Sequence, residues 1–334
     1  MRSLPHNAMS LLAATALLAA CDSTPKTTEP ATDMESPNVA VFGGEWSEPV
    51  LLDEAVNSPS GELGPELSPD RLSLYFNSNR PLEGFASFNI WVSQRACLDC
   101  PWQPARPLPA PINGTDNGGQ ATLSRDGHLL FFLSNREGSE PLADGSGPSE
   151  DIWMATRKNP TDDFGWENPV RPASAPGCES DGRVNTEQHD QVGGYVVAAP
   201  GGNAQLYFTR APELRIYRVT VGRDGNALDC AEPVTELGQP GRAPSVRADG
   251  RELIFWAPAS RGGRGASDLW VSARRNVTDP WTTPVNLGAP INSPFGELDN
   301  GLSHDGTTLV FSSGQARGGL GLSDIWIATR KRGP

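Results

Sequence analysis

Residues 302–313 read LSHDGTTLVFSS, and this stretch determines the fold because the chain contains three further copies of it. The other copies are LSPDRLSLYFNSNR at 67–80, LSRDGHLLFFLSNR at 123–136 and VRADGRELIFWA at 246–257. Each copy joins a short polar turn, which contains an aspartate, to an apolar segment with the length of a β-strand. The four turn aspartates are Asp70, Asp126, Asp249 and Asp305.

The spacing of these aspartates gives the number of repeats. Asp126 follows Asp70 by 56 positions and Asp305 follows Asp249 by 56, whereas Asp249 follows Asp126 by 123. The longer interval has room for two repeats, so we expect a fifth copy within it. Residues 196–210 (VVAAPGGNAQLYFTR) fit that place, with Pro-Gly-Gly instead of the Asp-Gly turn.

Each copy is followed by the same further elements. A second apolar segment, which contains Ile-Trp, Leu-Trp or Ile-Tyr, recurs at 89–92, 151–154, 215–218, 268–271 and 324–327. A third segment, most often rich in Trp and Pro, recurs at 102–112, 166–173, 230–237 and 281–291. With the short strand before each turn, these elements make four antiparallel strands per repeat, which is the composition of a β-propeller blade.

We therefore predict an all-β protein made of a single β-propeller with five four-stranded blades. The last copy ends before its outer strand, but residues 46–52 (WSEPVLL) match residues 281–287 (WTTPVNL) in pattern. This N-terminal strand is expected to complete the last blade and close the ring, which removes two free strand edges. A six-bladed ring is the alternative if residues 178–190 contain additional strands.

Residues 62–330 resemble the WD-like β-propeller repeats of the TolB family. The motifs that carry the resemblance are Ser-Pro-Asp at 68–70, Ser-Asn-Arg at 78–80, and Asp-Ile-Trp at 151–153 and 324–326. The resemblance implies the propeller fold over nearly all of the predicted folded region. TolB proteins carry an additional N-terminal domain, for which residues 22–42 are too short. The resemblance therefore implies the fold of that family rather than its role.

The N-terminal residues predict export and a lipid anchor. An apolar run at 8–18, too short to span a bilayer, leads into Leu18-Ala19-Ala20-Cys21, which resembles a bacterial lipobox. We predict a lipoprotein signal peptide over residues 1–20, a lipidated flexible tether over residues 21–42 and the propeller over residues 43–334. The lipid on Cys21 would hold the protein on a membrane of the bacterial cell envelope, facing the periplasm or the cell surface. An ordinary secretory signal is the alternative.

Charge and cysteine content restrict the partners and the compartment. The formal charge is −13, from 27 Lys and Arg against 40 Asp and Glu, which excludes nucleic acid as a partner because like charges repel. Besides Cys21 the chain has four cysteines, an even number suited to an oxidising compartment. Cys97 and Cys100 are expected to close a small loop, which leaves Cys178 to pair with Cys230. A zinc site built from the same four is the alternative.

The repeats also separate scaffold residues from candidate site residues. A side chain that recurs in every blade builds the blade, whereas one that interrupts the repeat near the axis is a candidate for ligand binding. The candidate channel-lining residues are Glu62, Glu66, Asp116, Gln120, Arg242, Glu297 and Asp299. Trp256, which lies outside the repeated tryptophan pattern, is a candidate platform for a sugar ring. The sequence does not assign catalytic residues.

No paired metal motif, phosphate loop or nucleophile elbow is present, so we predict neither a metal nor a cofactor. His189, with Glu187 and Asp190 beside it in an irregular loop, is the best-placed cluster for a metal ion, but we do not expect it to bind one.

We expect a lipid-anchored envelope propeller that acts as a binding or interaction module for a protein or glycan partner, rather than as an enzyme. The first alternative is a hydrolase of glycosides or polysaccharides, because carboxylates that converge on a channel can serve as acid and base. A purely structural envelope lipoprotein is the second alternative. Carboxylates that face one another across the channel distinguish the hydrolase from the other two.

Overall fold

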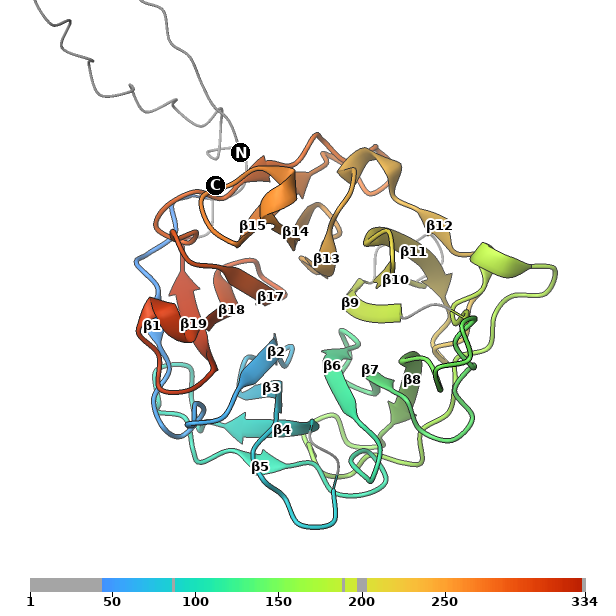
Figure 1. Cartoon of the computed structure of the whole chain (residues 1–334), viewed down its shortest axis with the longest axis horizontal. Coiled ribbons are helices and arrows are strands. Elements are labelled where there is room, and N and C mark those ends of the chain that lie inside the picture. The colour runs from blue at the N-terminus through green and yellow to red at the C-terminus, as the bar shows by residue number, and fades with distance from the viewer. Residues whose placement is uncertain (1–43, 86–87, 188–189, 197–202, 332–334) are drawn as a thin grey trace, which may run out of the picture. The chain divides into compact units, whose positions relative to one another are not determined.

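The repeated sequence units fold into five β-sheets that are arranged around one axis (Figure 1). The computed structural model describes residues 44–331 except 86–87, 188–189 and 197–202. The fold is an all-β propeller of five blades, as the repeats predict, and the six-bladed alternative is excluded. The expected signal peptide, Cys21, the tether and His189 lie outside the described residues.

In each blade the strands follow one another from the axis outward. Blade 1 contains β2 (Glu62–Leu67), β3 (Ser73–Ser78), β4 (Asn89–Gln94) and β5 (Arg106–Pro107). Blade 2 contains β6 (Gly118–Leu123), β7 (Leu129–Ser134) and β8 (Asp151–Thr156), and Val170 bridges to Met154 at its outer edge. Blade 3 contains β9 (Asp190–Val196), β10 (Ala204–Arg210), β11 (Arg215–Val221) and β12 (Glu232–Pro233).

The last two blades have the same order. Blade 4 contains β13 (Arg242–Val246), β14 (Glu252–Pro258), β15 (Ser267–Ala273) and β16 (Val285–Asn286). Blade 5 contains β17 (Glu297–Leu302), β18 (Thr308–Gly314), β19 (Ser323–Thr329) and β1 (Val50–Leu51). Short 3-10 helices lie in the connections, at Ser180–Gly182, Thr235–Leu237, Ala259–Arg261 and Gln315–Arg317.

The turn aspartates fix the connection between the first two strands of a blade. In blade 1, Ser68 Oγ donates a hydrogen bond to Asp70 Oδ1 at 2.6 Å, and the Leu72 amide donates to the same oxygen at 3.0 Å. The Ser–Asp bond recurs in blades 2 and 5, between Ser124 and Asp126 and between Ser303 and Asp305. A side-chain acceptor that binds a nearby amide stabilises a tight turn, so these aspartates belong to the scaffold.

The N-terminal strand closes the ring, as the sequence predicts. In β1, Val50 pairs with Ile327 and Leu51 pairs with Trp326 of β19. The Arg330 guanidinium lies 4.3 Å from the ring centroid of Trp46. Blade 4 has the same contact within one repeat, between Arg274 and Trp281 at 4.2 Å. Blade 5 is therefore assembled from both ends of the described chain.

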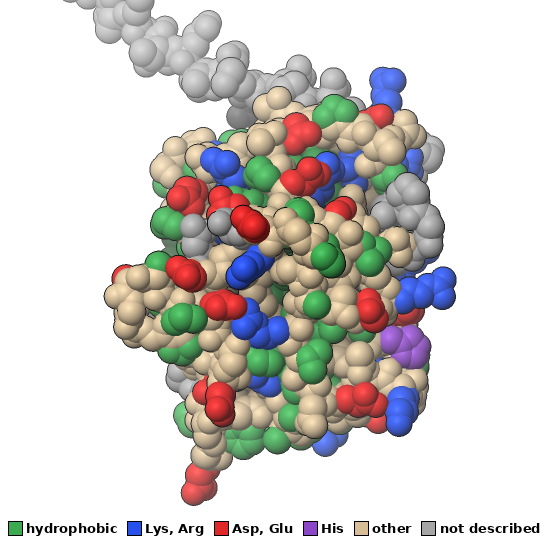
Figure 2. All heavy atoms as spheres, turned by 90° about the vertical axis from the view of Figure 1, so that its right-hand side faces the viewer, with side chains coloured by type: hydrophobic (Ala, Val, Ile, Leu, Met, Phe, Trp, Pro, Cys, Tyr) green, Lys and Arg blue, Asp and Glu red, His purple; other side chains and the backbone are tan. Residues whose placement is uncertain are grey.

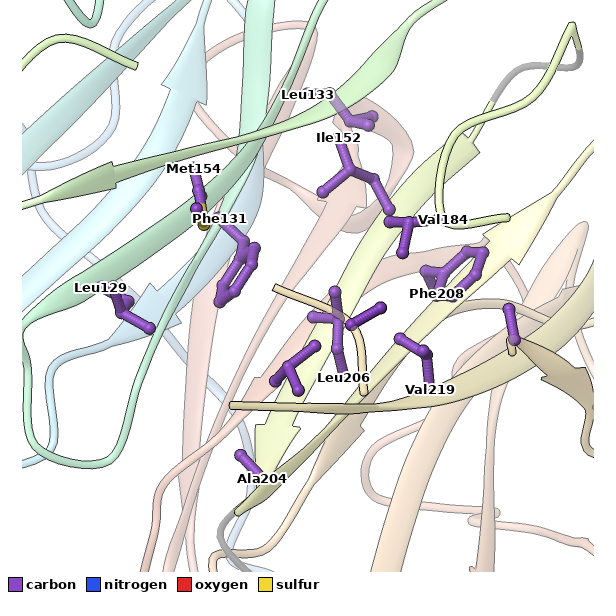
Figure 3. Packing of buried hydrophobic residues seen from close by; sticks show 13 residues of the cluster. Leu129, Phe131, Leu133, Ile152, Met154, Val184, Ala204, Leu206, Phe208 and Val219 are labelled. Carbon is purple, nitrogen blue, oxygen red and sulfur yellow. The ribbon is translucent and has the colours of Figure 1, made fainter. Parts of the chain in front are cut away.

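Five apolar clusters hold the blades together, one at each blade-to-blade contact. The cluster between blades 2 and 3 brings Phe131 and Ile152 against Leu206 and Phe208, all fully buried (Figure 3). Each sheet packs apolar side chains on both faces, so a blade needs a neighbour on each side to bury its surface. The core is consequently a ring of five interfaces.

A stacked arginine recurs in every blade, at or just after the end of its second strand. The five arginines are Arg80, Arg136, Arg210, Arg261 and Arg317. Arg317, for example, lies 5.2 Å from the ring centroid of Phe311 and 4.9 Å from that of Trp326. It also donates a hydrogen bond to the carbonyl oxygen of Ile291, in the segment that leads into the blade. The recurring tryptophans pack on these arginines and therefore form part of the scaffold.

The surface carries both signs of charge. Figure 2 shows acidic, basic and apolar side chains interspersed over one face of the molecule. Within the described part of the chain, no helix is long and apolar enough to cross a membrane.

Candidate functional site

The innermost strands turn particular side chains toward the axis by means of β-bulges. Register shifts occur at Leu63/Glu66 in β2, Gly119/Thr122 in β6, Arg242/Ser245 in β13 and Leu298/Asn300 in β17. The residues at the same position of these four bulges, six before the turn aspartate, are Gly64, Gln120, Ala243 and Asp299. Gln120 and Ala243 have φ values of 47° and 46°, a left-handed conformation that costs energy for residues other than glycine.

A pocket of about 390 Å³, called the axial pocket below, lies between blades 1, 2, 4 and 5. Its apolar lining includes Leu63, Phe88, Leu133 and Leu298. Its polar lining includes Asn77, Asn117, Gln120, Glu150, Arg242, Trp256 and Asp299. A few convergent polar groups among apolar side chains are typical of ligand-binding pockets.

Asp299 is held firmly in the axial pocket. Trp256 Nε1 donates a hydrogen bond to Asp299 Oδ1 at 2.9 Å, and Asp299 is 8% exposed. Burial raises the pKa of Asp299, although the bond from Trp256 and the positive charge of Arg242 act in the opposite direction. The Arg242 guanidinium lies 5.1 Å from the ring centroid of Trp256 and interacts electrostatically with both Asp299 and Glu150. The pocket thus combines one cation with two carboxyl groups.

A smaller cavity of about 30 Å³, called the axial cavity, shares Gln120 and Asp299 with the pocket. Glu66 lines it, and burial raises the pKa of Glu66 to about 8, against a weaker lowering by the hydrogen bond from Thr122. Gln120 and Asn300 also line this cavity. Their side-chain oxygens, Gln120 Oε1 and Asn300 Oδ1, are buried and accept no hydrogen bond from any described residue. Glu66 therefore carries its proton at neutral pH, in a cavity with unused acceptor oxygens.

Four of the predicted channel residues line these two spaces: Glu66, Gln120, Arg242 and Asp299. Glu62 and Glu297 do not, because each lies before the bulge and is fully buried against an arginine. Arg80 Nε lies 3.2 Å from Glu62 Oε1, and Arg317 Nη1 lies 2.7 Å from Glu297 Oε1. Asp116 does not line the pocket either, and its charge acts on Arg136.

Glu150 is the one charged residue of the pocket lining that was not predicted from the sequence. It immediately precedes the Asp-Ile-Trp motif of blade 2, where blades 1, 4 and 5 have Phe88, Ser267 and Ser323. A comparison of the residues just before this motif would have identified Glu150 as an interruption of the repeat. The predicted channel residues lie on or next to the innermost strands, whereas the third strand of blade 2 also begins at the axial pocket.

The four predicted cysteines form two disulfides, Cys97–Cys100 and Cys178–Cys230. The Ala231 amide donates to the Gly182 carbonyl at 2.9 Å, next to the second disulfide. The Cys178–Cys230 bond thus ties the segment that leads into β12 to the connection between blades 2 and 3.

Solved structures with the same fold include two α-L-arabinofuranosidases. The enzyme from Lactobacillus brevis is 13% identical, with a TM-score of 0.53 over 84% of this chain and 92% of that one. The enzyme from Podospora anserina, solved with cellotriose, is 12% identical, with a TM-score of 0.51 over 87% and 98%. A protein assigned as TolB from Agrobacterium tumefaciens is 16% identical, with a TM-score of 0.43 over 78% and 72%. No family model and no curated protein matches the sequence.

These neighbours correct the first functional expectation. We expected a binding or interaction module rather than an enzyme, and the similarity to glycoside hydrolases over most of the chain overturns it in favour of the first alternative. The expectation relied on missing motifs, but carboxyl groups contributed by separate blades produce no contiguous motif. At 12–13% identity the likeness establishes the fold alone, so the activity is argued from the axial pocket.

Proposed function

We propose that this chain is a glycoside hydrolase whose substrate binds in the axial pocket. The observation that carries the proposal is the placement of Asp299 and Glu150, two carboxyl groups from non-adjacent blades that line one pocket. Hydrolysis of a glycosidic bond uses a pair of carboxyl groups that flank it. The volume of about 390 Å³ falls within the range of small-molecule sites and suits one or two sugar rings.

The environments of the two carboxyl groups suggest different roles. Burial raises the pKa of Asp299, which favours the protonated form that a general acid needs to protonate the leaving oxygen. Glu150 is then the base or nucleophile on the other side of the bond. Arg242 lies within electrostatic reach of both and would orient them, while the bond from Trp256 fixes the carboxyl group of Asp299.

Hydrolysis of nitrophenyl glycosides by the full chain tests the proposal. An α-L-arabinofuranoside is the first substrate, because the two enzymes of similar fold are named for it. Asp299→Asn and Glu150→Gln should each lower kcat by at least about 100-fold, the usual contribution of a general acid or base. The proposal also predicts that kcat/KM falls above the pKa of Asp299.

Asp116→Asn is the matched control, because Asp116 is an acid of the same inner region that does not line the pocket. This variant should keep the activity of the unmodified protein. The proposal is wrong if no furanoside or pyranoside of a broad panel is hydrolysed, or if activity survives both pocket substitutions.

We further propose that Cys21 carries a lipid that anchors the protein at the cell envelope. The support is the sequence alone, namely the apolar run that ends in Leu18-Ala19-Ala20-Cys21. Expressed in a bacterium fed an alkyne-tagged fatty acid, the full chain should become labelled and Cys21→Ser should not. Equal labelling of both would contradict the proposal.

A further inference from the structure

The Cys97–Cys100 disulfide closes a hairpin between the third and fourth strands of blade 1. Blade 4 has the same hairpin without cysteines, since RACLDCPW at 95–102 aligns with RRNVTDPW at 274–281. Cys97 corresponds to Asn276, and Cys100 corresponds to Asp279. Blade 4 therefore shows how this hairpin folds without the covalent bond.

The two hairpins have matching backbone hydrogen bonds. The Cys100 amide donates to the Cys97 carbonyl at 3.1 Å, and the Asp279 amide donates to the Asn276 carbonyl at 3.1 Å. In blade 4 the Asn276 amide and side chain also donate to Asp279 Oδ2, both at 3.1 Å, in the place of the disulfide. The turn thus forms with hydrogen bonds alone.

The bonds that flank the turn match as well. Ser93 Oγ donates to the Gln103 carbonyl at 2.6 Å in blade 1, and Ser272 Oγ donates to the Thr282 carbonyl at 2.6 Å in blade 4. Arg95 stacks on Trp102 at 4.4 Å, as Arg274 stacks on Trp281 at 4.2 Å. These contacts hold the hairpin in shape whether or not the two sulfur atoms are joined.

The surroundings of Cys97 favour reaction at its sulfur. Cys97 is exposed, as is the neighbouring Leu98 at 44%, whereas in the other disulfide Cys230 is exposed but Cys178 is only 9% exposed. Arg95 Nη1 donates to the Leu98 carbonyl at 2.6 Å, between the two cysteines. A guanidinium group therefore lies against the loop that joins the two cysteines. An adjacent cation favours the thiolate, which is the reactive form in thiol–disulfide exchange.

We propose that Cys97 and Cys100 are a redox-active pair that exchanges with a dithiol while the propeller stays folded. A thiolate of the dithiol attacks Cys97 Sγ, the Cys97–Cys100 bond breaks, and Cys100 leaves as a thiolate. The second thiolate of the dithiol then attacks the mixed disulfide and releases Cys97. Two electrons and two protons pass to the protein, and the dithiol becomes a disulfide.

Stepwise reduction of the native full chain with dithiothreitol tests this inference independently of any hydrolase activity. Alkylation followed by peptide mass spectrometry should show Cys97 and Cys100 modified at concentrations that leave Cys178–Cys230 intact. Circular dichroism should stay unchanged, and removal of the reductant with mild oxidation should restore the disulfide. The disulfide should re-form at least about tenfold faster than in the isolated 95–102 peptide, because the folded hairpin holds the two thiols in place.

The double variant Cys97→Asn/Cys100→Asp, which carries the turn residues of blade 4, isolates the structural contribution. It should fold, melt within a few degrees of the reduced protein and consume no dithiol. Loss of structure in the reduced protein or in this variant would overturn the proposal, because the hairpin would then depend on the covalent bond. Reduction of both disulfides together, or re-formation of the Cys97–Cys100 bond no faster than in the peptide, would overturn it too.

Discussion

Glu66 occupies an inner-strand position at which three other blades carry smaller, uncharged residues. At the equivalent position blades 2, 4 and 5 have Thr122, Ser245 and Gly301. A Cβ atom on Gly301 would lie 3.1 Å from Glu66 Oε2 and only 2.3 Å from the carbonyl oxygen of Pro65. The glycine of blade 5 therefore makes the space that the carboxyl group of blade 1 enters.

The pKa of Glu66 makes the stability of the propeller depend on pH. An unfolded glutamate has a pKa of about 4.3, whereas that of folded Glu66 is about 8. Between these values the folded chain keeps a proton that the unfolded chain releases, so this stabilisation is complete at low pH and is lost as pH rises to 8. Its slope is at most about 1.4 kcal/mol per pH unit.

Glu66→Gln should consequently raise the Tm at pH 8 to 9, with little change near pH 5. Thermal melts of both proteins across this range measure the difference. Glu62→Gln is the contrasting control, because it removes the buried partner of Arg80 and should cost about 3 kcal/mol or more at either pH. A Glu66→Gln effect that does not vary with pH would show that the carboxyl group is not protonated in the folded state.

At the scale of the elements, β1 and the segment before it contribute more to the stability of the ring than the length of the strand suggests. The strand is two residues long, yet the segment that carries it places Trp46 among Ile254, Leu269 and Phe311 between blades 4 and 5. The Ser47 amide also donates to the Thr329 carbonyl at 2.8 Å. The segment thus both covers the edge of β19 and fills part of a blade-to-blade interface.

Trp46→Ala should destabilise the propeller by about 3 kcal/mol, since it removes a large, buried side chain. Unfolding by urea measures the loss. Trp281→Ala, the same position within blade 4, should cost a similar amount. A loss below about 0.5 kcal/mol for Trp46→Ala alone would mean that the N-terminal segment does not close the ring.

The blades were predictable from the sequence because each is built from recurring residues. The turn aspartates, the Ile-Trp strands and the stacked arginines appear several times, so one copy supports the interpretation of the others. The site was only partly predictable, because a bulge decides which residue of an inner strand faces the axis. Asp299 is the bulged residue of β17 and lines the axial pocket, whereas Glu297, two residues earlier, is buried against Arg317.

For the whole molecule, the ring explains why scaffold residues recur from blade to blade, whereas the residues of the axial pocket differ between blades. Stability comes from five interfaces at the blade contacts, and each of these is built from apolar side chains. The axial pocket receives single, different side chains from several blades, such as Glu150, Arg242 and Asp299. Substitutions at the axis therefore leave the interfaces intact, which allows one scaffold to carry different chemistry.

The closure of blade 5 also sets an order of events during synthesis. Ser47 and Thr329, which bond across the closing strands, are 282 positions apart. At roughly 5–20 residues per second, translation supplies Thr329 on the order of 14–56 s after Ser47. During that interval β1 has no β19 strand to pair with. Ring closure therefore cannot precede the synthesis of β19, and the segment around β1 is the part of the chain that has to wait for it.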